Sequence, residues 1–269
     1  MTQKIFQVDA FTAEPYRGNP AGVCILPEEK DEQWMQAVAR EMNVAETAFL
    51  VRDANDEDNF HLRWFTPTVE IALCGHATLA SAHVLWEEGI VRDEAKISFQ
   101  TRRSGVLTAV RAGEWIEMDF PAEPATQQTS YPMELRDALK VEPRYVGQNR
   151  FDFIVEVENE KILRSIEPDM RLLCALDVRG VIVTSRAEDS KYDFVSRFFA
   201  PGAGVDEDHA TGSAHCCLAP FWQERLGRAE MLGYQASPRG AEVRVRVVGE
   251  RVLLGGQAVT VLRGELLFS

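Results

Sequence analysis

The amino-acid sequence predicts a mixed α+β protein built from two similar halves, each with several strands and one buried helix. Two observations support this class. Most apolar runs have the length of strands and are bounded by turn residues such as Gly, Pro, Asn and Asp. Two longer segments of small apolar residues, 74–86 and 211–222, have helical length, lie about half the chain apart and lack a polar face, which is typical of enclosed helices.

The first half is expected to hold short strands, one helix with a single apolar face and the enclosed helix. The Gly18-Asn19 turn follows the first strand, because both residues tolerate positive φ. A helix with one apolar face is expected to begin after the capping residue Asp31 and to end at Asn43. The expected strands lie at 4–11, 21–26, 47–51, 61–65, 96–101, 104–111 and 115–120.

The second half repeats this plan. A Gly-rich acidic loop, 200–208, precedes the second enclosed helix. The expected strands lie at 151–157, 180–184, 191–199, 243–248, 252–254 and 258–263.

A proline-rich stretch at 121–132 separates the halves, because it contains three prolines and no apolar periodicity. We therefore expect an N-terminal lobe at 1–121, completed by the last strand at about 256–269. A linker at 122–131 and a C-terminal lobe at 132–255 account for the rest.

The two halves echo each other in sequence. Phe65-Thr-Pro67 precedes Cys74-Gly-His-Ala77, and Phe199-Ala-Pro201 precedes Thr211-Gly-Ser-Ala214. In both halves the enclosed helix then ends near a tryptophan. This shared order of features indicates an internal duplication.

The composition excludes several classes of protein. The chain of 269 residues carries 42 acidic and 29 basic side chains, a net charge of −13, and no clustered basic face for nucleic acid. No apolar run is long enough to span a membrane, and the start does not resemble a signal peptide. Five cysteines without framework spacing predict reduced thiols and a cytoplasmic protein.

The start of each enclosed helix is a candidate anion site. Free backbone N–H groups at Gly75 and Gly212 would lie at the positive end of a helix dipole. Two such ends facing each other would hold a small carboxylated molecule between the lobes. The alternative is structural: the glycines only allow tight turns, and His76 and Ser213 only cap helices.

Two carboxylates are candidates for proton transfer. Glu46 enters an apolar strand, where a partly desolvated carboxylate can act as a general acid/base. Asp208 lies just before the second enclosed helix. Either residue could instead be solvated, Glu46 at a strand edge and Asp208 in an acidic loop.

Other chemistries have less support. The spacings of His76 with His83 and of His209 with His215 do not match a helical metal-binding pair, so no metal is expected. Cys74 is either a thiolate activated at a helix start or a small buried thiol. No dinucleotide, nucleoside triphosphate or α/β-hydrolase motif is present.

Four motifs resemble the signatures of the PhzF-like family, the phenazine-biosynthesis-type isomerases. The resemblance runs from about residue 4 to residue 264, with the motifs in family order. The motifs are Gly18-Asn19-Pro20-Ala21, Asn43-Val-Ala-Glu46-Thr, Cys74-Gly75-His76-Ala77-Thr78 and Glu207-Asp208-His-Ala-Thr-Gly212-Ser213-Ala214.

The resemblance implies a diaminopimelate epimerase-like fold: two pseudo-symmetric lobes, each a β-barrel-like sheet around a central helix, here 75–88 and 212–226. It also implies a homodimer and cofactor-free proton transfer within a small carboxylic acid in the interlobe cleft. The best-known family member isomerises dihydro-3-hydroxyanthranilate.

The family motifs also imply roles for particular residues. Glu46 corresponds to the general acid/base, and His76 and Asp208 to groups that hydrogen-bond the substrate or relay the proton. The implied substrate-binding positions are Gly18, Asn19, Gly75, Gly212 and Ser213.

One departure leaves the reaction open. Many members carry proline after the motif aspartate, whereas this chain has His209. Epimerases of this fold use two opposed cysteines, and only Cys74 stands at such a position here. The alternatives are a racemase or epimerase with Glu46 and either His209 or Cys74 as opposed bases, and a non-catalytic protein that binds a small acid.

Overall fold

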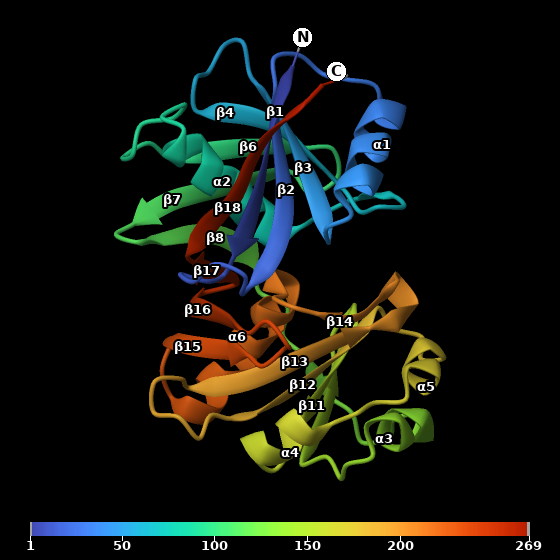
Figure 1. The fold of residues 1–269 in the computed structure, drawn as a ribbon. Coiled ribbons are helices and arrows are strands. Elements are labelled where there is room, and N and C mark those ends of the chain that lie inside the picture. The colour runs from blue at the N-terminus through green and yellow to red at the C-terminus, as the bar shows by residue number, and fades with distance from the viewer. Residues whose placement is uncertain (1, 268–269) are drawn as a thin grey trace. The chain divides into compact units, whose positions relative to one another are not determined.

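The computed structural model describes residues 2–267, and the chain divides into two compact units (Figure 1). Unit 1 comprises Met1–Asp119 and Gly255–Ser269, and unit 2 comprises Phe120–Leu254. Of the lobe ranges expected from the sequence, residues 1 and 268–269 lie outside the described part of the chain.

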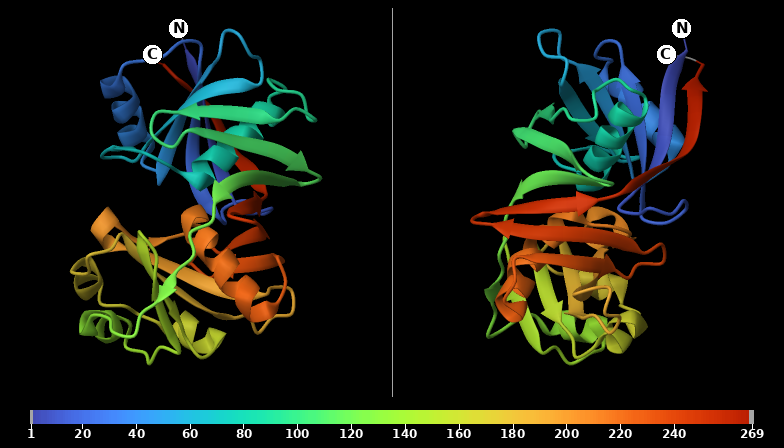
Figure 2. Two further views of the ribbon diagram at one scale, coloured as in Figure 1. Left: turned by 180° about the vertical axis from the view of Figure 1, so that it is seen from behind. Right: turned by 90° about the vertical axis from the view of Figure 1, so that its left-hand side faces the viewer.

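Unit 1 is a curved sheet in which the last strand of the chain pairs with the first. Figure 2 shows these two strands, in red and blue, side by side. The strand order is β18-β1-β2-β3-β4-β6-β7-β8, with the short β5 added to β4; β2/β3 and β4/β6 are parallel and the other pairs are antiparallel. The strands are β1 (Gln3–Ala10), β2 (Asn19–Leu26), β3 (Glu46–Arg52), β4 (Asn59–Phe65), β5 (Glu70–Ile71), β6 (Ile97–Thr101), β7 (Val106–Ala112), β8 (Trp115–Pro121) and β18 (Ala258–Leu266).

Helix α2 (Gly75–Glu87) is the core of unit 1. Almost every residue from His76 to Trp86 is buried, and the helix packs against β1, β2, β3 and β18. Small residues such as Ala77 and Ala80 allow the strands to approach closely. Helix α1 (Glu32–Met42) instead packs one apolar face on the outside of the sheet, against β3 and β4.

Unit 2 has the same plan around α6 (Gly212–Leu226), which is buried along most of its length. The outer helices are α3 (Met133–Leu139), α4 (Glu160–Ser165) and α5 (Met170–Cys174), and a single 3₁₀ turn spans Pro201–Ala203. The strands are β9 (Thr126–Gln127), β10 (Tyr145–Gln148), β11 (Asp152–Glu156), β12 (Gly180–Arg186), β13 (Phe194–Ala200), β14 (Val205–Asp208), β15 (Glu230–Gln235), β16 (Ala241–Val248) and β17 (Arg251–Gly256).

The two sheets have matching connections. In unit 2, β11/β12 and β13/β15 are parallel, as β2/β3 and β4/β6 are in unit 1. The short β14 adds to β13 as β5 adds to β4, and the enclosed helix follows directly in each case. This correspondence confirms the predicted α+β fold of two pseudo-symmetric halves.

The structure differs from the sequence expectations in several elements. The expected linker at 122–131 belongs to unit 2, where β9 hydrogen-bonds to β10. Strands β10, β14 and β15 and helices α3, α4 and α5 were not expected. The first enclosed helix ends at Glu87 rather than at 88, and the strand expected at 191–199 begins at Phe194.

The five cysteines are free thiols, of which Cys174 is exposed and the other four are buried. Among residues 2–267, no helix combines the length and the apolar character needed to cross a bilayer.

His215, on α6, is fully buried and is a source of acid sensitivity. Its Nδ1 lies 2.8 Å from the carbonyl oxygen of Thr211, so the neutral ring donates there. Burial lowers the pKa of His215 from 6.5 to about 4, despite that hydrogen bond. The unfolded chain therefore takes up this proton first as the pH falls.

We predict that His215 costs the fold about 3 kcal/mol between pH 6.5 and about pH 4, because its folded-state pKa lies below its unfolded value. Urea unfolding at several pH values should show this loss in the wild type. A His215→Asn variant, which has no ring to titrate, should show a correspondingly smaller loss over the same range. Parallel pH profiles for the two proteins would contradict the assignment.

Candidate active site

Four polar side chains meet in unit 1 where β2, β3 and α2 begin. Asn19 is the first residue of β2, Glu46 is the first residue of β3, and His76 is the second residue of α2. Because β2 and β3 are parallel neighbours, with Ala21 opposite Glu46, both strands begin at the same end of the sheet. Helix α2, enclosed by that sheet, also begins there, with Cys74 as its N-cap residue.

His76 is the centre of this cluster. Its Nε2 lies 2.9 Å from Oε2 of Glu46, and its Nδ1 lies 3.2 Å from Nδ2 of Asn19. The Cys74 Sγ is 3.5 Å from Nδ1. The His76 side chain is 6% exposed and that of Glu46 is 15% exposed, so the carboxylate retains limited access to solvent.

The charges of the cluster favour a protonated imidazole. Burial alone lowers the pKa of His76, but its contacts with Cys74 and with the Glu46 carboxylate together raise it well above its usual value. Burial, and then the nearby Glu46, raise the pKa of the Cys74 thiol to about 11, so the thiol is neutral at physiological pH. The Glu46 carboxylate is therefore the anion that holds the proton on His76.

Asn19 can hold either protonation state of the ring. With Nδ2 facing His76 Nδ1, the amide donates to a neutral imidazole. An amide turned by 180° would present its oxygen to an imidazolium instead.

The turn before Asn19 is built to fix this side chain. Gly18 has φ +60°, and a Cβ there would lie 2.1 Å from the carbonyl oxygen of Ala10. The Asp9 carboxylate accepts a hydrogen bond of 2.6 Å from the backbone N–H of Tyr16 in the same turn. Gly18 is thus required by the backbone, and its role in binding substrate stays a prediction.

In unit 2, the other predicted residues surround the start of α6. The Thr211 hydroxyl donates to Asp208 Oδ2 over 2.6 Å. Gly212 is the first residue of the helix and is buried, and Ser213 beside it is half-buried. Asp208 itself is the last residue of β14 and is half-buried.

Gln235, at the end of β15, is a supporting residue that the sequence did not reveal. Its Oε1 accepts the Thr211 backbone N–H over 2.9 Å, and its Nε2 donates to the Asp208 carbonyl over 2.7 Å. It is 1% exposed and joins the two segments that flank His209. The only sequence signal was an amide at the end of an apolar strand, where the next residues are Ala-Ser-Pro.

The two enclosed helices differ from three of the outer helices at their first turn. Side chains of Asp31, Asn159 and Asp169 accept backbone N–H groups of α1, α4 and α5. In the described chain, the N-cap side chains Cys74 and Thr211 make no such bond to α2 and α6. The positive end of each enclosed helix thus lacks a side-chain cap and suits a carboxylate or a developing oxyanion.

The unit 1 cluster also has donors suited to a metal ion. Atoms of Glu46, Cys74 and His76 lie within 4.8 Å of one another, a mixed O, S and N set of the kind that binds zinc. The sequence expectation of no metal rested on histidine spacing and did not consider this cluster. Of the histidines weighed in the sequence, His76 is the member of this cluster.

The class of protein follows from this fold. Two pseudo-symmetric α+β units, each with a sheet around a central helix, define the diaminopimelate epimerase-like fold. A hydroxyproline epimerase from Agrobacterium vitis has the same fold, with a TM-score of 0.63 at 14% identity over 98% of this chain and 92% of that one.

The family follows from closer similarities. The family model described as "Phenazine biosynthesis-like protein" matches residues 8–264. An uncharacterized isomerase of Halalkalibacterium halodurans is 54% identical over 99% of both chains. A PhzF family protein of Enterococcus faecalis has a crystal structure that covers 100% of both chains, with a TM-score of 0.94 at 38% identity. The chain therefore belongs to the PhzF-like family of isomerases, as its motifs predicted.

We predict that Gly18→Ala destabilises the protein by at least about 3 kcal/mol, because a Cβ there combines positive φ with a clash against Ala10. Gly89 is the matched control, since its φ is +65° and nothing lies within 4 Å of its added Cβ. Gly89→Ala should cost only about 1 kcal/mol. Equal losses in chemical denaturation would show that the close approach at Gly18 is unimportant.

We predict that His76 stays protonated above its ordinary pKa of about 6.5, since Glu46 lies against it. This proton stabilises the fold below that pH, and the contribution is lost as the pH rises through the folded-state pKa. Ring ¹⁵N shifts followed by NMR should show the raised pKa in the wild type. In Glu46→Gln it should fall to or below the ordinary value; an unchanged pKa would exclude Glu46 as its cause.

Proposed function

We propose that this protein is a cofactor-independent isomerase that moves a proton within a small, cyclic carboxylic acid, with Glu46 as general acid/base. The observation that carries the proposal is the buried contact of 2.9 Å between Glu46 and His76 at the start of α2. A carboxylate that is largely shielded from water and is held by a histidine can remove a proton and return it.

The proposed reaction has two proton transfers. Glu46 takes a proton from a ring carbon of the substrate: the C–H bond breaks, an O–H bond forms, and the electron pair is delocalised toward the substrate carboxylate. The O–H bond then breaks as the same proton is delivered to another carbon on the same face. One double bond changes position and no net proton is consumed.

The other residues stabilise charge in this proposal. An imidazolium at His76, in contact with Glu46 through Nε2 and with Asn19 through Nδ1, stabilises developing negative charge or relays the proton. Backbone N–H groups at Gly75 bind the substrate carboxylate or the developing anion, and Asn19 keeps the His76 ring in place. In unit 2, Asp208 and the start of α6 at Gly212 and Ser213 keep the polar and anion-binding roles that the family motifs imply.

The alternative of a racemase with two opposed bases has less support. Its first thiol would be Cys74, whose pKa is raised to about 11 by burial and by Glu46, so a reactive thiolate is disfavoured. The residue at the corresponding place in unit 2 is His209 rather than a second cysteine.

We predict that Glu46→Gln lowers turnover by about a thousandfold while leaving the fold and ligand affinity nearly intact, because the amide keeps the shape but cannot accept the proton. Glu87→Gln, which changes a partly exposed glutamate on α2, is the control and should retain activity. The assay screens a panel of cyclic carboxylic acids by NMR, with calorimetry for binding. Wild-type turnover in Glu46→Gln would remove this residue from the mechanism.

The isotope content of the product separates the alternatives. In deuterated water, a single-base proton shift retains some substrate hydrogen at the new position. A two-base racemase instead exchanges the α-hydrogen with solvent. Tight binding of an acid without turnover, by a protein that is correctly folded, would identify a non-catalytic binding protein.

A further inference from the structure

Each unit contains the same buried ion pair in the hairpin that leads to its enclosed helix. In unit 1, Arg63 on β4 donates through Nε and Nη2 to both carboxylate oxygens of Glu70 on β5, over 2.7 and 2.8 Å. In unit 2, Arg197 on β13 donates in the same two-point manner to Glu207 on β14, over 2.8 and 2.9 Å.

The two pairs are equivalent in register as well as in chemistry. Glu70 lies opposite Phe65 in the ladder, and Glu207 lies opposite Phe199. Each glutamate stands five residues before the glycine that begins the enclosed helix. Each arginine also lies over the ring of the phenylalanine two residues later, at 5.0 Å in unit 1 and 4.7 Å in unit 2. The same register and the same ring contact thus occur in both units, which points to a shared role for the two pairs.

Each arginine also joins its hairpin to an outer helix. Arg63 Nη2 donates to Glu32, in the first turn of α1, over 3.0 Å. Arg197 Nη1 donates to the carbonyl oxygens of Leu163 and Ile166, at the end of α4, over 3.3 and 2.7 Å. The side chains of Arg63 and Arg197 are only 8% and 12% exposed.

The strands that carry the two glutamates are short and partly exposed. Strand β5 has two residues, and the following Ala72 and Leu73 are exposed, with one bond from Ser104 to the Ala72 carbonyl. Strand β14 has four residues, of which Val205 and Asp206 are exposed. Since short exposed strands form weak ladders, the two-point ion pair is a strong constraint on each segment; in unit 2 it acts beside the two hydrogen bonds from Gln235.

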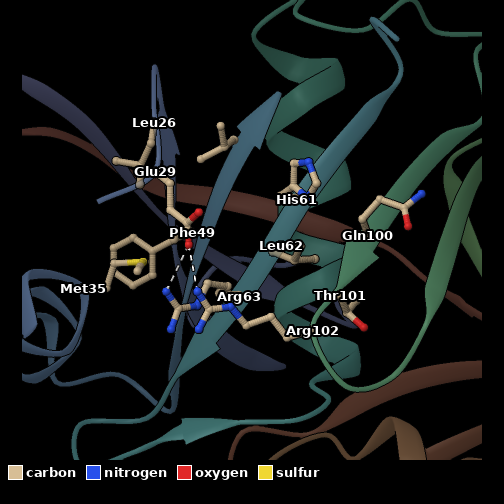
Figure 3. Close-up of a pocket in the computed structure, with 11 residues that line it drawn as sticks. Leu26, Glu29, Met35, Phe49, His61, Leu62, Arg63, Gln100, Thr101 and Arg102 are labelled. Atoms are coloured by element: carbon tan, nitrogen blue, oxygen red, sulfur yellow. Dashed lines mark hydrogen bonds and ion pairs between the residues drawn. The ribbon is translucent and has the colours of Figure 1, made fainter. Parts of the chain in front are cut away.

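Solvent-exposed charges near Arg63 contribute less to holding this hairpin than Glu70 does. A pocket of about 190 Å³ lies beside it on the outer face of the sheet (Figure 3). Glu29, which contacts both Arg63 and Arg102 there, has a side chain that is 61% exposed. Ion pairs in such a position contribute little to stability. Glu70, with a side chain only 13% exposed, is the stronger partner, and the Arg63 hydrogen bond lowers its pKa.

We propose that Arg63–Glu70 and Arg197–Glu207 are equivalent positioning pairs, which set where the site residues at the start of each enclosed helix lie. The first pair holds the segment that delivers Cys74 and His76. The second holds the segment that ends in Asp208. The importance of these positions rests on the proposed function, but the pairs can be tested without a substrate.

Hydrogen exchange read by mass spectrometry tests the proposal on single variants of the full chain. In Glu70→Gln, amides of residues 70–76 should exchange about tenfold faster, while residues 205–213 remain as in the wild type. Glu207→Gln should give the converse pattern. Glu158→Gln, which breaks the exposed Arg144–Glu158 pair, is the matched control and should change neither segment.

A second measurement separates positioning from a general loss of stability. At one fixed pH, the ring NMR shifts of His76 and the side-chain amide shifts of Asn19 should change in Glu70→Gln, because the ring moves relative to Glu46, and should not change in Glu158→Gln. Arg63→Lys, which keeps the charge but loses the two-point bond, should give an intermediate exchange rate. The proposal is overturned if exchange in both segments is unchanged, if it rises equally in β1 and along the whole of α2, or if the His76 and Asn19 shifts stay as in the wild type. The proposed role of Glu46 is tested separately, by the turnover of Glu46→Gln, so a failure of one proposal does not decide the other.

Discussion

Enclosing a helix that has no polar face is the constraint on which both units depend. Helix α2 is buried along its length, so strands must surround it and only its ends can reach polar partners. The helix therefore starts at the end of the sheet where β2 and β3 begin. That coincidence brings Asn19, Glu46 and His76 together, and it places the positive end of the helix in the same cluster. The site is thus a consequence of how the core is closed.

Much of this arrangement could be predicted from the sequence. The apolar run from Gly75 to Trp86 predicted the enclosed helix, and its echo after Gly212 predicted the second one. The motif residues Glu46 and His76 were named in advance, and the structure brings them into contact. Asn19 was predicted to bind substrate; in the structure it contacts His76, and its substrate contact stays a prediction.

The remaining features depend on contacts that one sequence does not display. Gln235 acts through two hydrogen bonds to a segment 24 and 27 residues away, and no local pattern marks them. The short strands β5, β9 and β14 form because partners are available, not because of their own apolar periodicity. Likewise, the prolines in 121–132 indicated a linker, whereas Thr126 and Gln127 within it form a strand that pairs with β10. The sequence left Cys74 open between an activated thiolate and a small buried thiol; burial raises its pKa to about 11, which favours the neutral thiol.

The pairing of β1 with β18 has a consequence for the order in which the chain can fold. Unit 2 is one continuous stretch, Phe120–Leu254, whereas unit 1 needs both ends of the chain. During synthesis, unit 2 has all of its residues before the strand that completes unit 1 has been made. Until β18 has been made, one edge of β1 therefore has no partner strand. An unpaired strand edge can associate with other chains.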